Sequence, residues 1–517
     1  MEATTEAIAP QLSTAAARLR ALLDRLVDMD FTSPIASAAL GIAIIATRLY
    51  WLDLGYGTDP DAWRVAITAQ YLWDEASYWP SRLPGYPLHE LATALVIRGG
   101  WVWTNLTTVF ASLAGVYIFA ALAKKLDLPH RGALTLGFAF MPLLWINSVM
   151  TMDYMWALTF IMAAYLALLQ RSPTGAGLLL GIAAGFRLTS LYMLLPFWLL
   201  LLRTDRRSEV RAVTFTSLAT TLVVFTPVLM QYGISFLNFF DETVPLDEFI
   251  KRLAKDGVGI IGALAVIAGV ALSLPRLRRL PADLVRDANV LVWVTVMAVY
   301  FLSYTRLPHE IAYLIPIFPF GFFLMSRYFS RAVLLWTLSI IVLAGFVDIT
   351  SPEDASGIDR TTFTSARIGE GMLLSDIDTL RNQQDFAHEV REMTLTNPNI
   401  QRPAVVAVGF IYPELVMLYK DDLKVGILEE DANAISQLSD KGLAQDEEAE
   451  IDYVWLLDYD DLQAYKREGR TIYVTADAER STYAVYGYRP AYFGAIELPL
   501  SRENPSLGEG TSSTDRR

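Results

Sequence analysis

The sequence contains no cysteine among its 517 residues. Disulfide bonds, thiolate metal sites and cysteine nucleophiles are therefore excluded. Charged side chains are also scarce, at 19% of the chain, whereas hydrophobic residues reach 53% and the mean hydropathy is +0.35. Soluble domains lack the long unbroken apolar runs that this chain contains. The composition therefore indicates an integral membrane protein.

Apolar runs recur through residues 34–350. Because a run of about 20 residues crosses roughly 30 Å of hydrocarbon, we expect an all-α polytopic membrane domain with about eleven transmembrane helices. They are predicted near 34–52, 101–123, 132–149, 152–170, 175–186, 188–202, 213–233, 257–274, 288–305, 311–326 and 331–349. Segment 175–186 is too short to cross alone, and Arg187 stands at its break. A broken helix at membrane depth is tolerated where it lines a cavity.

Basic residues in every second short loop set the expected orientation. The loops that carry them contain Lys124, Lys125, Arg131, Arg203, Arg206, Arg207, Arg211, Arg276, Arg278, Arg279, Arg286, Arg327 and Arg331. We expect a multi-pass protein of the inner or plasma membrane, with a cytoplasmic N-terminus and an extracytoplasmic C-terminal domain. Residues 1–33 lack the pattern of a signal peptide and are expected to form a cytoplasmic interfacial segment.

The character of the chain changes after residue 350. Residues 351–517 hold 31 of the 55 acidic side chains but only 16 of the 42 basic ones. This acidic surface argues against a nucleic-acid partner and against docking on anionic lipid. The tail at 501–517 is expected to be disordered.

Short apolar runs alternate with helix-like segments within 351–500, which predicts a small extracytoplasmic α/β domain. The runs are Val405–Val408, Lys424–Leu428, Tyr453–Leu457, Thr471–Val474 and Tyr492–Leu498. No Gly-x-Gly-x-x-Gly pattern follows the first run, so the sequence indicates no nucleotide site there.

The first outside loop, 54–100, is long and carries two candidate carboxylates. Two amphipathic helices are expected near 60–76 and 87–98. Asp59 precedes Pro60 and is either a helix cap or a functional acid, since Asp-Pro is a good helix start. Asp61 lies inside the helix, where capping does not explain it, and it is favoured as a general base. Either carboxylate could instead hold a cation.

Asp153 and Arg187 are the next candidates. Asp153 begins the fourth predicted span on the outside, where it either complements the helix N-terminus or serves a site. Arg187 interrupts an apolar hairpin, and ionisable groups at such depth usually serve a site or a partner. A guanidinium matches phosphate oxygens, although Arg187 could also extend to the interface.

Three further basic residues fall on outside segments. Arg82 begins the turn of the first outside loop, and Arg306 and His309 precede the tenth span. Together with Arg187 they could bind a phosphate, with Tyr86 and Tyr313 shaping the pocket, although Arg306 could equally anchor the interface. Arginines would stabilise a leaving phosphate while an Asp activates the acceptor. The residues thus favour a reaction on a phosphate-bearing lipid at the membrane surface.

The order of these motifs resembles the membrane glycosyltransferases of the GT-C fold. The resemblance is to the protein-mannosyltransferase-like family, glycosyltransferase family 39, which includes the aminoarabinose lipid A transferases. It covers about residues 34–350. Its marks are Asp59-Pro60-Asp61, the turn Pro84–Pro87, Asp153, the segment Gly177–Thr189 and the element His309–Pro316. The family's Asp-Glu pair is Asp-Pro-Asp here, and Arg187 replaces its usual Lys.

The resemblance implies an enzyme that moves a hexosyl or pentosyl group from a polyprenyl-phosphate donor to an extracytoplasmic glycan, lipid or protein. In that family the first-loop Asp is the base, and it best matches Asp61, with Asp59 as the alternative. The signature Trp-Trp-Asp-Tyr-Gly is absent, so neither Asn-linked transfer nor an obligatory divalent metal is inferred, and no cofactor is expected.

Two other classes remain open from the residues. A secondary transporter or lipid flippase would also carry broken helices with charges at depth, but the chain shows no convincing internal repeat. A scaffold whose outside domain binds an envelope partner is the third reading.

Overall fold

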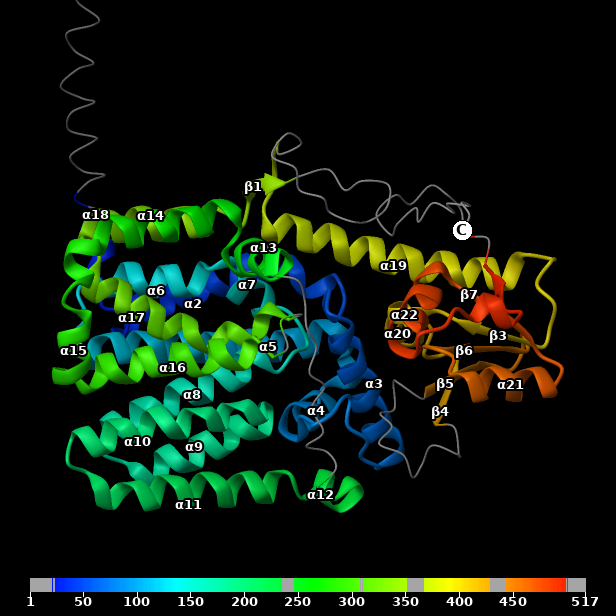
Figure 1. The fold of residues 1–517 in the computed structure, drawn as a ribbon, viewed down its shortest axis with the longest axis horizontal. Coiled ribbons are helices and arrows are strands. Elements are labelled where there is room, and N and C mark those ends of the chain that lie inside the picture. Colours follow the sequence, from blue (N-terminus) through cyan, green and yellow to red (C-terminus); the bar gives the residue numbers. More distant parts are fainter. Residues whose placement is uncertain are drawn as a thin grey trace, which may run out of the picture.

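The computed structural model describes residues 21, 24–234, 246–306, 308, 310–350, 367–427, 442–498 and 500. It consists of a helical body followed by a unit that contains a β-sheet, with the sheet at one end of the helices (Figure 1). Most of the predicted interfacial segment, the whole predicted disordered tail and His309 lie outside the described residues.

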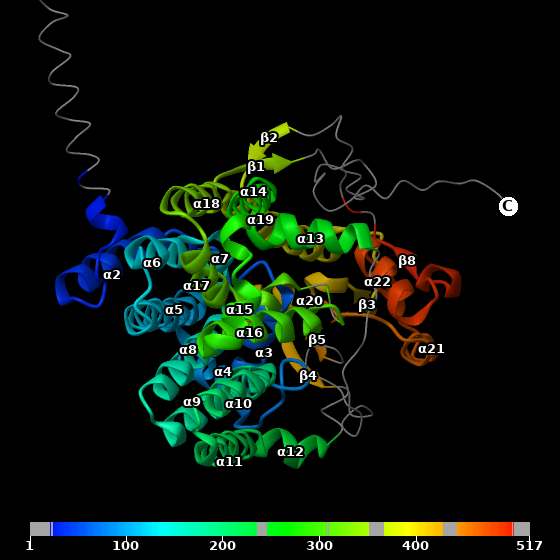
Figure 2. The same cartoon turned by 60° about the vertical axis from the view of Figure 1, so that its left-hand side comes forward.

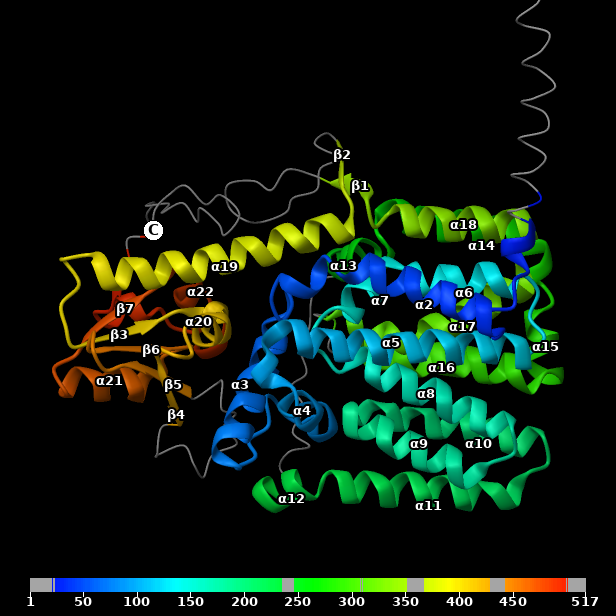
Figure 3. The same cartoon turned by 180° about the vertical axis from the view of Figure 1, so that it is seen from behind.

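The helices of the body run side by side along a common direction (Figures 1 and 3). They are α2 (Pro34–Arg48), α3 (Pro60–Glu75), α4 (Pro87–Ala94), α5 (Gly100–Lys125), α6 (Arg131–Phe140), α7 (Pro142–Ser148), α8 (Tyr154–Leu169), α9 (Pro173–Phe186), α10 (Leu194–Arg203), α11 (Arg207–Val224), α12 (Thr226–Tyr232), α13 (Leu246–Val258), α14 (Ile260–Leu277), α15 (Leu280–Arg286), α16 (Ala288–Tyr304), α17 (Phe318–Tyr328) and α18 (Arg331–Leu343). Short 3-10 turns η1 (Trp51–Asp53), η2 (Ile97–Gly99), η3 (Leu188–Met193) and η5 (Ile311–Ile317) join them. Exceptions to the common direction include α3 and α4, which lie at the end of the body that faces the sheet.

The number of helices that could cross a bilayer is smaller than expected. Among the described residues three are long and apolar enough, Ile97–Lys125, Ile260–Leu277 and Ile311–Tyr328, or up to five if each bent pair is one span. The prediction of about eleven spans is therefore corrected. The predicted span 132–149 is divided before Pro142 into α6 and α7. Other apolar helices have only 10–17 residues, about 15–25 Å at 1.5 Å per residue.

The outer faces of several helices expose large apolar side chains. Leu264, Ile267 and Leu272 of α14 are all more than half exposed, as are Phe215 and Leu222 of α11. Water-exposed surfaces rarely carry contiguous apolar patches, whereas lipid accommodates them. With the three apolar spans, these faces identify a membrane protein.

Helix α9 packs closely against both α8 and α11. A side chain on Gly181 of α9 would place its Cβ 2.8 Å from the carbonyl oxygen of Ser217 on α11, so only glycine permits this approach. After Phe186 the chain becomes extended at Arg187, and η3 then leads into α10. The break predicted at Arg187 is present, and it lies beside the residue that precedes α8, Asp153.

The sheet unit begins with a hairpin of β1 (Val347–Thr350) and β2 (Arg367–Glu370), which lies beside α14 and the start of α19 (Figure 2). A second sheet has the order β4-β5-β6-β3-β7-β8. Strands β6, β3, β7 and β8 are parallel to one another, β5 pairs antiparallel with β6, and β4 pairs antiparallel with β5. Its strands are β3 (Ala404–Ala407), β4 (Lys424–Ile427), β5 (Gly442–Asp446), β6 (Ile451–Val454), β7 (Thr471–Val474) and β8 (Ile496–Glu497). The helices of this unit are α19 (Met372–Thr396), α20 (Tyr412–Leu418), α21 (Tyr459–Arg467) and α22 (Ala476–Tyr486), with short turns η6 (Gly409–Ile411) and η8 (Pro490–Phe493).

All five predicted apolar runs contain or overlap a strand, so the small sheet region is confirmed. Strand β5 was not predicted, because Gly442–Asp446 is short and Leu443 and Ala444 are too few to form an apolar run. The hairpin of β1 and β2 was also missed, since its first strand extends the apolar run of α18.

Helix α19 ties the sheet unit to the residues that precede α3. The Thr58 hydroxyl donates to Asp376 at 2.7 Å, and the Gln383 amide donates to the Thr58 carbonyl oxygen at 3.1 Å. Gln384 donates in the same way to the Leu54 carbonyl oxygen. The start of α3 is therefore fixed from both parts of the molecule.

Candidate active site

The first turn of α3 presents two carboxylates in different roles. Asp59 is the N-cap residue, and its Oδ1 accepts the backbone N–H of Asp61 at 2.9 Å. Pro60 occupies the first helical position, where its missing N–H costs nothing. The capping interpretation of Asp59 thus matches its geometry, and the Asp61 carboxylate remains available for other partners.

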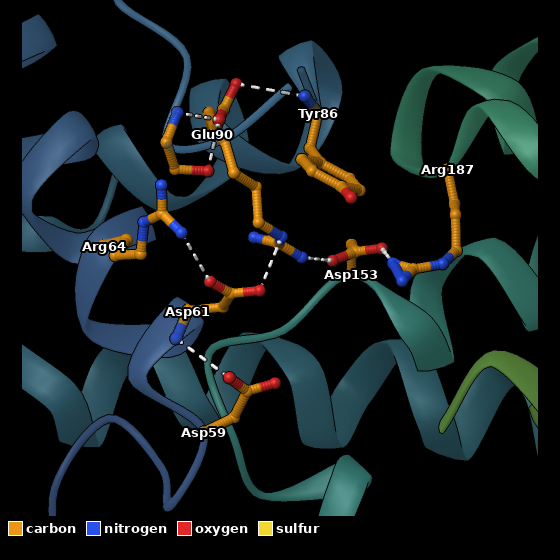
Figure 4. Close-up of polar contacts among 9 residues, drawn as sticks. Asp59, Asp61, Arg64, Tyr86, Glu90, Asp153 and Arg187 are labelled. Carbon is orange, nitrogen blue, oxygen red and sulfur yellow. Dashed lines mark hydrogen bonds and ion pairs between the residues drawn. The ribbon is translucent and has the colours of Figure 1, made fainter. Parts of the chain in front are cut away.

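The side chains of Asp61, Arg82, Asp153 and Arg187 form a continuous line of ion pairs. Arg82 Nε lies 2.8 Å from Asp61 Oδ2, and Arg82 Nη2 lies 2.8 Å from Asp153 Oδ1. Arg187 Nη1 lies 2.5 Å from Asp153 Oδ2. Arg64 extends the line at the other end, with its Nη1 3.1 Å from Asp61 Oδ1. Figure 4 shows the side chains of Asp61 and Arg64, from α3, and those of Asp153, just before α8, and Arg187, just after α9, directed toward the centre of this line.

This line carries more positive than negative charge and is largely removed from solvent. Three arginines alternate with two aspartates, and Asp153 has no exposed surface, while Arg82 and Arg187 are each 7% exposed. Arg82 Nη1 is buried without a hydrogen-bond partner among the described residues. A buried donor left unpaired is costly, so an anionic acceptor is the natural complement of this group.

Tyrosine rings line both central guanidinium groups. The Arg82 Cζ atom lies 3.9 Å from the ring centroid of Tyr86. The Arg187 Cζ atom lies 3.9 Å from the centroid of Tyr154 and 4.8 Å from that of Tyr313. Cation–π contacts hold a guanidinium in place without using its N–H donors.

A buried carboxylate holds the loop that carries Arg82. Glu90 Oε1 accepts both the backbone N–H and the hydroxyl of Ser81 at 2.6 Å, and Glu90 Oε2 accepts the Tyr78 hydroxyl at 2.5 Å. Burial raises the pKa of Glu90, while the hydrogen bonds from Ser81 and Tyr78 act in the opposite direction. The turn predicted between the two amphipathic helices is therefore anchored from α4.

A further carboxyl group, that of Glu310, lies close to Asp59 at the start of α3. Burial raises the pKa of Asp59 well above its usual value, and the negative charges of Asp61 and Glu310 add to this effect. Glu310 caps η5 by accepting the backbone N–H of Ala312 at 2.9 Å, and burial raises its pKa as well.

The structure brings most of the predicted site residues together. Arg82, Asp153 and Arg187 join Asp61 in the ion-pair line, while Asp59 caps the same helix turn and Tyr86 and Tyr313 contact the guanidinium groups. Arg306 is exposed, and no contact among the described residues joins it to the line.

Sequence reasoning missed Arg64, Glu90, Glu310 and Tyr154 as site residues. Arg64 could have been found, because it lies three residues after Asp61 and therefore on the same helix face. Glu310 lies in the predicted element His309–Pro316. Its role as a helix cap could not be predicted, because it depends on where η5 begins. Among the described residues no group of three or more His, Asp or Glu side chains could hold a metal ion.

No protein family model and no curated protein matches the chain. Among solved structures it is similar to the crystal structure of ArnT, an aminoarabinose lipid A transferase with the GT-C fold, from Cupriavidus metallidurans in the apo state. That match has a TM-score of 0.49 at 12% identity and covers 75% of this chain and 84% of that one. The same protein bound to undecaprenyl phosphate matches with a TM-score of 0.48 at 13% identity, over 75% and 85% of the two chains. Because both scores are below 0.5, the functional proposal rests on the residues of the site.

Proposed function

We propose that this protein is a membrane glycosyltransferase that uses a polyprenyl-phosphate-linked sugar as donor. The observation that supports this most directly is Arg82, whose buried Nη1 has no partner among the described residues although the group lies between two carboxylates. Buried guanidinium groups beside a carboxylate suit a reaction in which a phosphate leaves and a hydroxyl loses its proton.

Arg82 and Arg187 bind the donor phosphate in this proposal. Both are fixed by Asp153, which accepts from each of them, and both lie against tyrosine rings. A fixed fork of donors needs no reorganisation when negative charge develops on the leaving phosphate. Asp153 therefore positions the two guanidinium groups and does not take part in proton transfer.

Asp61 is the proposed general base. Its side chain is 26% exposed, and its Oδ2 contacts the same guanidinium that would bind the phosphate. A bound phosphate competes for Arg82 and weakens the pairing of Asp61, which then accepts the proton of the acceptor hydroxyl. The acceptor oxygen forms a bond to the anomeric carbon, the bond from that carbon to the phosphate oxygen breaks, and polyprenyl phosphate leaves with the electron pair. Asp59 keeps its role as the cap of α3.

The site is proposed to face the extracytoplasmic side. It lies at the end of the helical body that carries the sheet unit, whereas the basic turn containing α15 lies at the opposite end (Figure 1). Basic turns favour the cytoplasm, so the sheet unit and the site belong outside, at the inner or plasma membrane.

Purified protein in lipid nanodiscs, supplied with polyprenyl-phosphate hexose or pentose donors, tests the proposal through release of polyprenyl phosphate. We expect Asp61→Asn to lower kcat by about 100-fold or more, the usual effect of losing a general base. Asp74→Asn is the matched control, since Asp74 is an exposed residue on the same helix.

Arg82→Gln should weaken donor binding, whereas Arg203→Gln, an exposed change elsewhere in the body, should not. Full activity of a normally inserted Asp61→Asn variant would rule out the assigned base. Lipid or solute movement across proteoliposomes without any cleavage of the donor would favour a transporter.

A further inference from the structure

A cavity of about 960 Å³ lies between the helical body and the sheet unit, next to the start of α3. Its walls come from α7, the end of α13, the hairpin of β1 and β2, and the first turns of α19, and Thr58, Asp59 and Pro60 also line it. Cavities of 300–1,000 Å³ hold small organic ligands. Asp61, Arg82 and Arg187 do not line this space, but it reaches the first turn of the helix that carries Asp61.

The lining of the cavity is acidic, in contrast to the excess of arginines in the ion-pair line. The charged residues that line it are Asp59, Lys255, Asp256, Glu310, Asp348, Arg367, Glu370 and Asp376. Six are acids and two are bases. Asp348 is used structurally, because it accepts the backbone N–H groups of Ile260 and Ile261 at the start of α14.

Three of the acids come from different elements and retain acceptor capacity. Asp59 Oδ1 and Glu310 Oε1 each accept one backbone N–H, and their second oxygens have no hydrogen bond among the described residues. Asp376 of α19 accepts the Thr58 hydroxyl through Oδ1 alone among the described residues. A carboxyl group accepts hydrogen bonds when ionised and can also donate one when protonated, so these groups match ligands that carry several hydroxyl groups.

We propose that this cavity binds the acceptor, and that the acceptor is an uncharged, hydroxyl-rich glycan. The inference rests on the proposed function and names its second substrate. The lining holds only two bases against six acids, so it offers a phosphate-bearing acceptor few cationic partners, whereas sugar hydroxyls form hydrogen bonds with carboxyl groups. Leu143, Ile146 and Met150 also line the cavity and give the C–H face of a sugar an apolar surface.

The position of the cavity would bring the acceptor hydroxyl close to Asp61, the proposed base. Thr58–Pro60 line it, and Asp61 follows directly in the same turn. A glycan held there presents its terminal hydroxyl at the start of α3, while the donor phosphate lies beyond Asp61 at Arg82 and Arg187. The acceptor hydroxyl beside Asp61 and the leaving phosphate at the arginines can then lie on opposite faces of the anomeric carbon, as direct displacement requires.

The test measures acceptor KM with neutral octyl glycosides and with the same glycosides carrying a 6-phosphate or an amino group. We expect Asp376→Ala to raise the acceptor KM by about 10-fold or more, since a hydrogen bond to a charged group contributes that much. Ser375→Trp should block the cavity and have a similar effect. Asp385→Ala, an exposed change on the same helix, is the control.

Donor cleavage by water in the absence of glycoside, measured on the native protein and on Asp385→Ala, tests the proposed function without an acceptor and so separates this inference from it. Unchanged acceptor KM values in active variants would overturn the inference alone. Preference for the phosphorylated or the amino glycoside would overturn the acceptor class. Saturation-transfer NMR with the neutral glycoside and the full chain reports binding without turnover. We expect a signal from the native protein that Ser375→Trp abolishes. Absence of this signal from the native protein, or its persistence in Ser375→Trp, counts against the cavity.

Discussion

Asp376→Asn should make the protein more stable at neutral pH, because the native carboxylate is held in an unfavourable place. Burial raises the pKa of Asp376 from its usual 3.8 to about 6, although the hydrogen bond from Thr58 partly opposes this. The folded state therefore binds a proton more tightly than the unfolded state. Between pH 3.8 and about pH 6 the stability of the native protein therefore falls as the pH rises.

The size of the effect follows from the shift. About two pKa units correspond to about 3 kcal/mol at 1.36 kcal/mol per unit, and this is the most that the ionised group can cost above pH 7. Asparagine stays neutral and its side-chain oxygen can still accept from Thr58. The variant should thus unfold roughly 5–10 °C higher than the native protein at pH 8, if the sheet unit unfolds as one domain.

Thermal unfolding followed by tryptophan fluorescence at pH 4 and pH 8 is the assay. The two proteins should differ little in unfolding temperature at pH 4, where Asp376 is protonated in the folded state and nearly half protonated in the unfolded state, whose pKa is 3.8. An equal gain at both pH values would show that the substitution acts through packing. No gain at pH 8 would refute the reasoning, because the ionised carboxylate would then carry no penalty.

Two further substitutions act on the line of ion pairs and on its support. Asp153→Asn should destabilise the protein by about 3–5 kcal/mol, because Arg187 loses its buried anionic partner, and a lowered unfolding temperature in nanodiscs measures this. Trp455→Ala should lower kcat but leave the donor KM unchanged, since the Arg64 Cζ atom lies 4.9 Å from the Trp455 ring and Arg64 in turn holds the base. Trp455→Phe should restore most of the rate, and an unchanged kcat in Trp455→Ala would exclude a positioning role.

The helical elements of the first outside loop could be predicted because their signals are local. Pro60 and Pro87 each mark a helix start, and both α3 and α4 begin there. The break at Arg187 was also predictable, since the apolar segment before it is short. The number of spans could not be predicted. Hydrophobicity indicates that a segment avoids water but does not show whether it crosses lipid or packs inside the protein. Met155 and Leu158 of α8, for example, are fully buried among other helices.

Part of the composition of the candidate site could be predicted, but its connectivity could not. Arg82 and Asp153 are 71 residues apart in sequence and share a hydrogen bond in the fold. The sequence placed both on the outer side without indicating that one arginine would bridge two aspartates. The distinction between Asp59 and Asp61 also needed coordinates, because capping is defined by the direction of one side chain toward one N–H group.

The part played by the sheet unit was invisible in the sequence, and it alters how a truncation should be interpreted. Asp376 and Gln383 of α19 bind Thr58, and Trp455 packs on Arg64, so the sheet unit holds both sides of the helix turn that carries the base. Removing residues 360–517 would also remove a wall of the acidic cavity. Loss of transfer in such a truncation therefore does not identify a separate accessory function. Substitutions that change the cavity but spare the hydrogen bonds to Thr58, such as Ser375→Trp in the full chain, can separate support of the base from recognition of the acceptor.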